Sequence, residues 1–359
     1  MSPAVPKKRR RVVAIDIGRG SAVIGMAMVH TLWMYGDIAT QRDSWLGVLL
    51  HLMGKATTLF LVAMGFSYML SRRQDLAGSI RRGLSILLLG YAMNFLKFVV
   101  PIGLGTMPDA FIAAYGWSSP LSPAQYLHLV LTGDILQLAG LALIGMGLVR
   151  RFTPSKPALL AWAAFFAWGS HLVRGLRLGV PGVDYGLDLL WGTEFNVYFP
   201  LFPWFAPILT GMFFGAWYLE DGRDDDRLFR RMLWLGLALL PAGVVLSLLD
   251  PTTHFADFFH MGAGGMTYLV GLNLVAAWVF HRIDAPRRLP RTFGVIRYFS
   301  TRVTTMYVVQ WVTICWGMGL VGYQTLGVGG VLVAIAAVLP LTVVIDRGLD
   351  RWIERPSRT

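Results

Sequence analysis

The chain has 359 residues, of which 55% are hydrophobic and only 14% are charged, against about 25% charged residues in an ordinary soluble domain. This composition excludes two or three soluble domains, and the apolar runs that recur from end to end exclude a disordered or fibrous chain. One cysteine, Cys315, excludes an internal disulfide and a thiol-pair redox site. What remains is a multi-pass membrane protein.

Ten apolar runs of membrane length follow one another along the chain, and they are too long and too uniform to be barrel strands. No repeat of about 20–50 residues is visible. We therefore expect an all-α polytopic membrane helix bundle, with a basic segment 1–11, a single transmembrane domain 12–346 and a tail 347–359. The expected helices cover residues 12–35, 45–70, 83–103, 125–149, 157–173, 195–219, 232–249, 261–281, 294–316 and 325–345.

The distribution of basic residues predicts the orientation of these helices. The net charge is +12, and 24 of the 32 lysines and arginines fall in 7–11, the even-numbered loops and the C-terminal tail, against three in the odd-numbered loops. Because cytoplasmic loops are rich in Lys and Arg, both termini are expected in the cytoplasm, and the protein in the cell (plasma) membrane. The run 7–11 resembles a nucleic-acid tag, but it precedes an apolar stretch too long for a signal peptide and indicates a retained first helix. We therefore expect no nucleic-acid partner.

Ionisable side chains inside a membrane span are costly, so they mark candidate functional sites. The first predicted helix carries Asp16, Arg19 and His30, which lie along one stripe at about 100° per residue. Arg19, in the cytoplasmic half, and His30, near the opposite surface, are about 16 Å apart along the axis. Two structural alternatives stay open: an Asp16–Arg19 ion pair, and a histidine that only hydrogen-bonds a neighbouring helix.

Four other predicted helices carry polar side chains that indicate one shared internal cavity. They are His51 and Lys55, Asn94 and Lys97, His128, Asp134 and Gln137, and Arg297 and Arg302. Lys55 or Lys97 could pair structurally with Asp134, or the cations could form a corridor for an anionic cofactor or substrate. Which pairs meet does not follow from the sequence.

Two weaker patterns have ordinary structural explanations. His254, Asp257 and His260 have an HxxDxxH spacing that fits no strong metal signature, and no metal is expected. The long outer connections carry aromatic residues that either anchor the membrane interface or form the wall of an acceptor site. These are Tyr115 and Trp117 in 104–124, and Tyr185 and Trp191 in 174–194.

The opening of the chain resembles that of transmembrane acyltransferases. Residues 11–20 read RVVAIDIGRG and lead to His30, which is similar to the R…(L/I)D…RG opening of the heparan-alpha-glucosaminide N-acetyltransferase-like proteins, the YeiB-like proteins and acyltransferase family three. The spacing of Arg19 and His30 matches the Arg-x10-His motif proposed as catalytic in the last of these branches.

Further segments resemble the glucosaminide branch in the same order along the chain. They are 59–73 for FLFLxGxSxxLSxRR, 82–90 for RG…LLLLG, 133–137 for GILQ, 199–211 for FPLxPW…G and 300–311 for SLxLYxxHW. Departures also occur, since Gln310 stands where many relatives have His and Ser21 where a small apolar residue is usual. The human-type enzymes have their proposed active histidine in the first non-cytoplasmic loop, but residues 36–44 contain none, so shared chemistry would fall to His30 or His51.

The resemblance implies transfer of an acyl group, acetyl in this branch, from cytoplasmic acyl-CoA to a hydroxyl or amine of an extracytoplasmic glycan acceptor. His30 would be the general base, with Arg19 and Asp16 as the other catalytic candidates. The remaining candidates are Lys55, Lys97, Arg297 and Arg302 for acyl-CoA, and His51, Asp134, Gln137 and Trp204 for the acceptor substrate.

Two rival functions stay open at this stage. A transporter or flippase would use intramembrane charges for passage, although the lack of repeat symmetry counts against it. A binding or sensor relative that has lost chemistry is the other, and Gln310 leaves room for it. The expected partners are the bilayer, acyl-CoA and the acceptor, and a homodimer also stays open.

Overall fold

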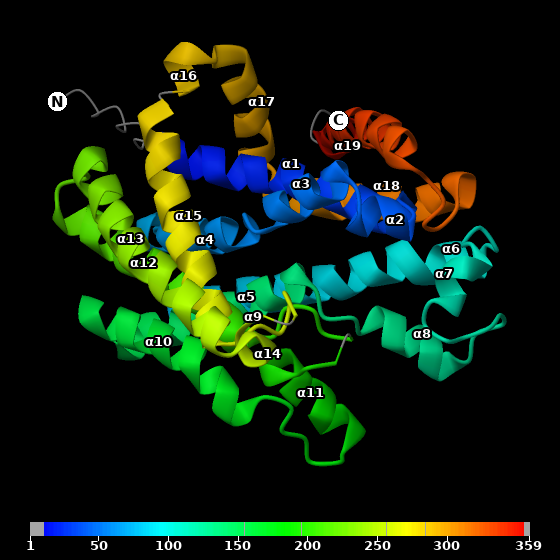
Figure 1. Ribbon diagram of the computed structural model, residues 1–359, viewed down its shortest axis with the longest axis horizontal. Helices are drawn as coiled ribbons and strands as arrows, with labels where there is room; N and C mark the ends of the chain where they lie inside the picture. The colour runs from blue at the N-terminus through cyan, green and yellow to red at the C-terminus, as the bar shows by residue number, and fades with distance from the viewer. Residues whose placement is uncertain (1–10, 154, 195, 256, 284, 355–359) are drawn as a thin grey trace.

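The computed structural model describes residues 11–153, 155–194, 196–255, 257–283 and 285–354 (Figure 1). This part of the chain forms helices and no strand, with two isolated backbone bridges, Gly36–Leu326 and Gly133–Val197. Eight of its helical segments are long and apolar enough to cross a membrane. The prediction of an all-α polytopic helix bundle is therefore confirmed.

The eight membrane-length segments overlap eight of the ten predicted ranges. They are α1 (Val13–Tyr35), α3 with α4 (Trp45–Gly54 and Thr57–Leu70), α5 with η1 and α6 (Leu76–Asn94, Phe95–Val99 and Val100–Gly103), α9 (Ile135–Phe152), α13 (Asp225–Leu249), α15 (Ala263–Ile283), α18 (Val303–Val321) and α19 (Val328–Glu354). The other two ranges form α10 (Lys156–Val173) and α12 (Leu201–Glu220), which do not meet the same measure of length and apolarity. The shorter helices are α2 (Ile38–Arg42), α7 (Asp109–Ala113), α8 (Pro123–Val130), α11 (Pro181–Trp191), α14 (Pro251–His254), α16 (Ala285–Arg288) and α17 (Pro290–Thr301).

Three of the predicted continuous helices are broken. The range 45–70 divides into α3 and α4 at Lys55, and the range 294–316 divides into α17 and α18 at Arg302. The range 125–149 divides into α8 and α9 just before Asp134, whose side chain forms a capping box with Gln137. The apolar runs continue through all three breaks, so hydropathy alone does not reveal them.

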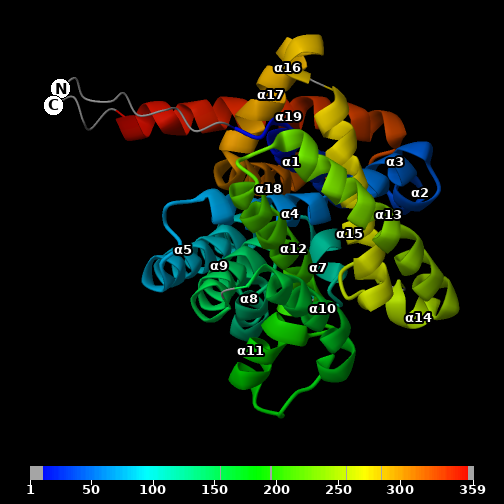
Figure 2. The same cartoon turned by 90° about the vertical axis from the view of Figure 1, so that its left-hand side faces the viewer.

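Helix α1 occupies the interior of the bundle. It packs against α3, α4, α17, α18 and α19, while α4 packs on α12, α12 on α10, α5 on α9 and α13 on α15 (Figures 1 and 2). In α1, 72% of the most apolar stretch is buried inside the protein, against 17% in α13, which faces outward. The polar side chains on α1 therefore lie among other helices and not in lipid.

The first residues of α1 and the last turns of α19 lie at the same end of the bundle. Ser300, at the end of α17, donates a hydrogen bond to Asp16 (3.0 Å). Two residues further on, Arg302 pairs with Asp346 (2.9 Å) near the end of α19. The two ends of the transmembrane domain are thus on one side, and assigning that side to the cytoplasm stays a prediction.

Helices α4 and α12 cross at two glycines that permit backbone contact. A Cβ atom would lie 1.8 Å from the Ile208 oxygen at Gly65, and 2.0 Å from the Val62 oxygen at Gly211. Alanine at Gly65 must push the helices apart, so we expect it to lower the free energy of unfolding by at least about 1–3 kcal/mol.

The matched control for this crossing is Gly186→Ala in α11, because no heavy atom lies within 4 Å of a Cβ at Gly186. Denaturant unfolding in detergent micelles measures both variants. We expect Gly186→Ala to be at least as stable as the wild type. A Gly65→Ala protein of wild-type stability would show that the helices do not need this close approach.

Candidate active site

A large cavity in the described part of the chain has a volume of about 650 Å³, within the range of small-molecule sites. Twelve of its lining residues are Phe, Tyr or Trp. They come from α1, η1, α7, α18 and the connections after α7, before α12, after α14 and after α18. The polar lining residues are His30, Gln41, His51, Lys55, Thr57, Lys97, Thr132, Asp134 and Gln324. Five of the predicted polar residues, His30, His51, Lys55, Lys97 and Asp134, are thus brought together in one place.

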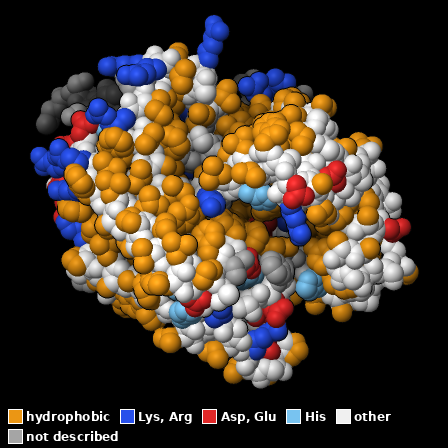
Figure 3. Space-filling view, viewed as in Figure 1, with side chains coloured by type: hydrophobic (Ala, Val, Ile, Leu, Met, Phe, Trp, Pro, Cys, Tyr) orange, Lys and Arg blue, Asp and Glu red, His pale blue; other side chains and the backbone are white. Residues whose placement is uncertain are grey.

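One face of the molecule is hollowed near its centre, between the positions of α3, α5 and α15 (Figure 3). Basic and histidine side chains show at the edge of this hollow, and hydrophobic side chains cover the surface around it. A polar interior surrounded by an apolar outer surface is typical of a functional cavity in a membrane protein.

His30 is buried against α18. Its ring stacks on Trp311 with centroids 3.9 Å apart, and its Nδ1 lies 3.3 Å from the amide nitrogen of Gln310. No described residue hydrogen-bonds its Nε2, so that nitrogen is free for a substrate. Gln310 therefore contacts His30 itself through its side-chain amide.

His51 lines the same cavity but is held differently. The indole N–H of Trp33 donates to His51 Nε2 at 3.0 Å, so this nitrogen is already engaged and a neutral ring carries its proton on Nδ1. His51 is also exposed, whereas the His30 residue is 7% exposed. Of the two candidate histidines, His30 is the one with a free Nε2 in an enclosed setting.

Lys97, and not Lys55, meets Asp134. Its Nζ lies 3.4 Å from Asp134 Oδ2, and the two side chains are 2% and 9% exposed. The π-helical turn η1 carries Lys97, and its ammonium group lies 4.3 Å from the centre of the Trp311 ring. Lys97 and His30 therefore both contact Trp311, which places the buried ion pair beside the candidate base.

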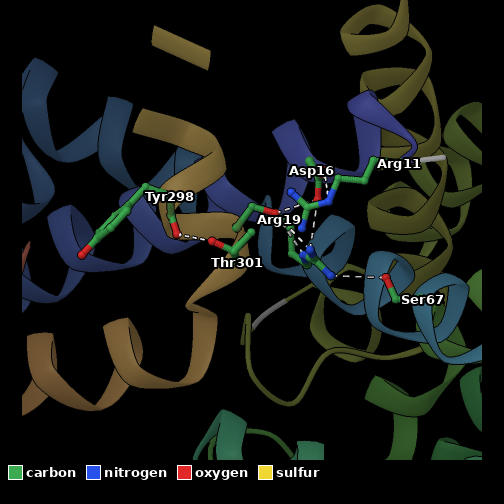
Figure 4. A network of polar contacts seen from close by, with 7 residues as sticks. Arg11, Asp16, Arg19, Ser67, Tyr298 and Thr301 are labelled. Carbon is green, nitrogen blue, oxygen red and sulfur yellow. Dashed lines mark hydrogen bonds and ion pairs between the residues drawn. The ribbon is translucent and has the colours of Figure 1, made fainter. Parts of the chain in front are cut away.

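A second, smaller pocket lies at the other end of α1. It has a volume of about 350 Å³ and is lined by Arg11, Arg19 and residues 300–305. Figure 4 shows Arg19 between Asp16 on its own helix (3.1 Å) and Ser67 on α4 (3.3 Å). The predicted Asp16–Arg19 ion pair is thus confirmed, and it borders a basic pocket.

An apolar cluster separates the small pocket from the large cavity. Val23 lies on α1 between Arg19 and His30, and it packs with Phe299 and Met306. Met306 itself stands between Thr305, which lines the small pocket, and Tyr307, which lines the large cavity. A ligand that reaches along α1 from one to the other passes these side chains.

The side chains predicted to bind acyl-CoA do not lie together. Lys55 and Lys97 line the large cavity, whereas Arg302 lines the small pocket and pairs with Asp346 and with Asp350 (2.5 Å). Arg297 is exposed on α17 and lines neither of them. These four residues cannot contact one ligand group together.

Two of the four predicted acceptor residues support the cavity without lining it. Gln137 accepts from the Asp134 backbone N–H (3.0 Å) and so completes the cap of α9. Trp204 is fully buried and donates to the backbone oxygen of Phe259 (2.7 Å), a lining residue. His51 and Asp134 line the cavity as expected.

The long connection 104–124 contributes more than interfacial anchors. Tyr115 lines the cavity, stacks on Trp117 at 4.9 Å, and has its phenol pKa raised by burial, so it stays neutral. Tyr185 and Trp191 do not line the cavity. Within the described residues, no group of three or more His, Cys, Asp or Glu side chains could hold a metal ion.

Several lining residues carry no charge and so were missed by a search for costly charges. Trp33 and Gln41 lie beside His30 and His51, and Tyr198, Phe259 and Tyr323 come from connections. Tyr307 and Trp311 belong to the late sequence motif, which was the available signal for them. Their position on the face of α18 toward His30 depends on how the helices pack.

Residues 11–242, more than half of the chain, match the family model described as heparan-alpha-glucosaminide N-acetyltransferase, catalytic. The chain belongs to this family. No curated protein matches the chain. The matched region contains His30, His51 and the Lys97–Asp134 pair, whereas α18 with Gln310 lies beyond it. Membership points to a membrane acetyltransferase.

Proposed function

We propose that the protein transfers an acetyl group from cytoplasmic acetyl-CoA to a hydroxyl or amine of an extracytoplasmic glycan. The observation that carries this proposal is the arrangement along α1: a basic pocket at Arg19 and an enclosed histidine with a free Nε2 at His30. The family uses acetyl-CoA as donor in general. The positive-inside rule supports cytoplasmic termini, and we propose the plasma membrane as the location.

The small pocket is suited to the phosphate groups of the donor. Arg11 and Arg19 share the one carboxylate of Asp16, which leaves a net positive charge there. The pocket also contains the first residues of α18, whose free N–H groups and helix dipole favour an anion. With the phosphates bound here, the acyl arm points along α1 toward His30.

His30 supplies the base for the transfer step. Its Nε2 takes the proton of the acceptor hydroxyl or amine as the acceptor atom attacks the thioester carbonyl carbon. The carbon–sulfur bond then breaks, and the imidazolium returns the proton to the leaving thiolate, which departs as the thiol of CoA. The buried ammonium of Lys97 lies near enough to favour negative charge on the carbonyl oxygen.

Acetyl-CoA binding is tested by thermal unfolding of the detergent-purified protein with a matched pair of arginine variants. Since Arg19 also neutralises Asp16, the variant Asp16→Asn/Arg19→Gln removes the basic group without leaving a buried carboxylate. The net charge is unchanged by this variant, so the expected loss comes from the missing guanidinium contact to a phosphate, and we expect stabilisation by acetyl-CoA to weaken about 10-fold or more in concentration. The control, Arg297→Gln, should behave as the wild type because Arg297 is exposed outside both cavities.

The transfer itself is measured with acetyl-labelled acetyl-CoA and glucosamine as probe acceptor on opposite sides of proteoliposomes. Label on glucosamine without leakage of acetyl-CoA supports the proposal. Passage of acetyl-CoA or glucosamine through the membrane without acetylation would instead identify a transporter. Equal acetyl-CoA binding by the Asp16→Asn/Arg19→Gln and Arg297→Gln proteins would contradict the assignment of the small pocket.

A further inference from the structure

Lys55 stands at the break between α3 and α4, and its side chain lines the large cavity. A neighbouring helix stabilises this break, because the side chain of Asn273 on α15 donates to the Lys55 backbone oxygen (3.0 Å). Gly54 lies against Val29, the neighbour of His30 in sequence, with 3.8 Å between a Cβ at Gly54 and the Val29 side chain. The α3–α4 break and its hydrogen bond to α15 therefore hold Lys55 beside the candidate active site.

The charge of Lys55 is not compensated by the protein. Three charged side chains line the cavity, namely Lys55, Lys97 and Asp134, and the last two pair with each other. No carboxylate of the described chain lies in ion-pair distance of Lys55. Its Nζ lies 5.2 Å from the Phe255 ring centre and 5.3 Å from that of Tyr268, contacts that hold a cation without neutralising it.

Lys55 is partly buried in the cavity wall, and an ammonium group that has aromatic rings but no carboxylate beside it favours an anion as its partner. These features together favour the binding of one negatively charged group.

The anion that fits this position does not come from the donor. The phosphates of acetyl-CoA belong to the small pocket, beyond the apolar cluster of Val23, Phe299 and Met306. The large cavity is instead lined at the opposite end of α1 by Gln41 on α2 and by Tyr115 and Tyr323, which lie in connections. A ligand of Lys55 therefore enters from the acceptor side.

We propose that Lys55 binds an oxyanion, a carboxylate or a phosphate, carried by the acceptor. That this ligand is the acceptor rests on the proposed function, whereas the anion site itself rests on the cavity and its charges. The anion could belong to a soluble acidic sugar or to a lipid, since Val48 and Leu52 on the neighbouring α3 are 64% and 56% exposed apolar residues. The shared chemistry is an oxyanion next to a transferable hydroxyl or amine.

Binding of two matched probe pairs, followed by the fluorescence of cavity-lining Trp33 and Trp311, separates these sources. Methyl glucuronide is compared with methyl glucoside, which lacks the carboxylate. Dioctanoyl phosphatidic acid is compared with dioctanoylglycerol, which lacks the phosphate. We expect the anionic member of at least one pair to bind about 10-fold to 100-fold more tightly in the wild type.

The variants Lys55→Met and Lys55→Arg decide whether Lys55 causes that preference. Methionine keeps the apolar stem between Phe255 and Tyr268 but removes the charge, so the preference should disappear; arginine should keep it. Lys156→Met, at the start of α10, is the control and should bind as the wild type. Equal binding within both pairs, or an unchanged preference in Lys55→Met, would overturn the proposal.

These measurements contain no donor, so they are independent of the transfer reaction. An anion preference that depends on Lys55, found in a protein without acetyl transfer, would leave the anion site standing and refute the proposed function. Acetyl transfer without any anion preference would support the proposed function and refute the anion site at Lys55.

Discussion

We expect His30→Ala to lose acetyl transfer, with a rate lower than the wild type by about 10²–10⁴-fold, the usual contribution of a general base. The reason is geometric: His30 Nε2 has no hydrogen-bond partner among the described residues and belongs to the cavity that also holds Lys97 and Asp134. Initial rates with acetyl-labelled acetyl-CoA and glucosamine measure the effect. Acetyl-CoA should still stabilise the variant, because the small pocket is unchanged.

His51→Ala is the matched control, since His51 lines the same cavity but its Nε2 accepts from Trp33. We expect it to retain most of the transfer rate and to raise the KM for the acceptor. If His51→Ala abolishes transfer while His30→Ala keeps the wild-type rate, the assignment of the base is reversed. Loss of activity counts as catalytic only for protein whose thermal midpoint without ligand matches the wild type.

Gln310 is placed to position His30 and not to contact the substrate. Gln310 contacts His30 Nδ1 at 3.3 Å and has no free path to a substrate, because the Gln310 residue is 1% exposed. Its carbonyl oxygen has no hydrogen-bond partner in the described chain, so the amide is held mainly through His30. A role for α18 in orienting the base follows from this contact, which the match over residues 11–242 does not reach.

The fold was predictable where apolar length decides it, and not where helices break. Hydropathy located α1 and α15 within a few residues, because a span needs about 20 apolar residues. It missed the break before Asp134, where the cap is formed with Gln137 and where Asn94 donates to the backbone oxygen of Thr132 (2.7 Å). The D-x-x-Q spacing was a readable signal of this cap, but the bond from Asn94 comes from another helix.

The site was predictable as a set of costly charges, but its pairing was not. The stripe of Asp16, Arg19 and His30 followed from helix geometry, and the Asp16–Arg19 contact is confirmed. The division of these residues between two cavities was not foreseen, because it depends on Val23 meeting Phe299 and Met306 from distant helices. The choice of Lys97 over Lys55 as partner of Asp134 likewise depends on the π-helical turn at 95–99.

That buried pair gives the second large expected effect. Lys97→Met leaves Asp134 without its partner, and Asp134→Asn leaves Lys97 without its own, in surroundings where the two side chains are 2% and 9% exposed. Each single variant should lower the free energy of unfolding by about 3–5 kcal/mol, the usual cost of an unpaired buried charge. Asparagine still caps α9, so the second variant isolates the charge from the cap.

The double variant Lys97→Met/Asp134→Asn removes both charges and should recover much of the lost stability, because neither partner is left unpaired. Denaturant unfolding of the four proteins in detergent gives the coupling energy between the two sites. Additive losses of stability would contradict an interaction between Lys97 and Asp134.

The transfer rate of the recovered double variant then assigns the role of the pair. A wild-type rate makes the pair a structural element of the cavity wall, whereas a lost rate with acetyl-CoA binding intact makes the Lys97 charge part of the chemistry at His30.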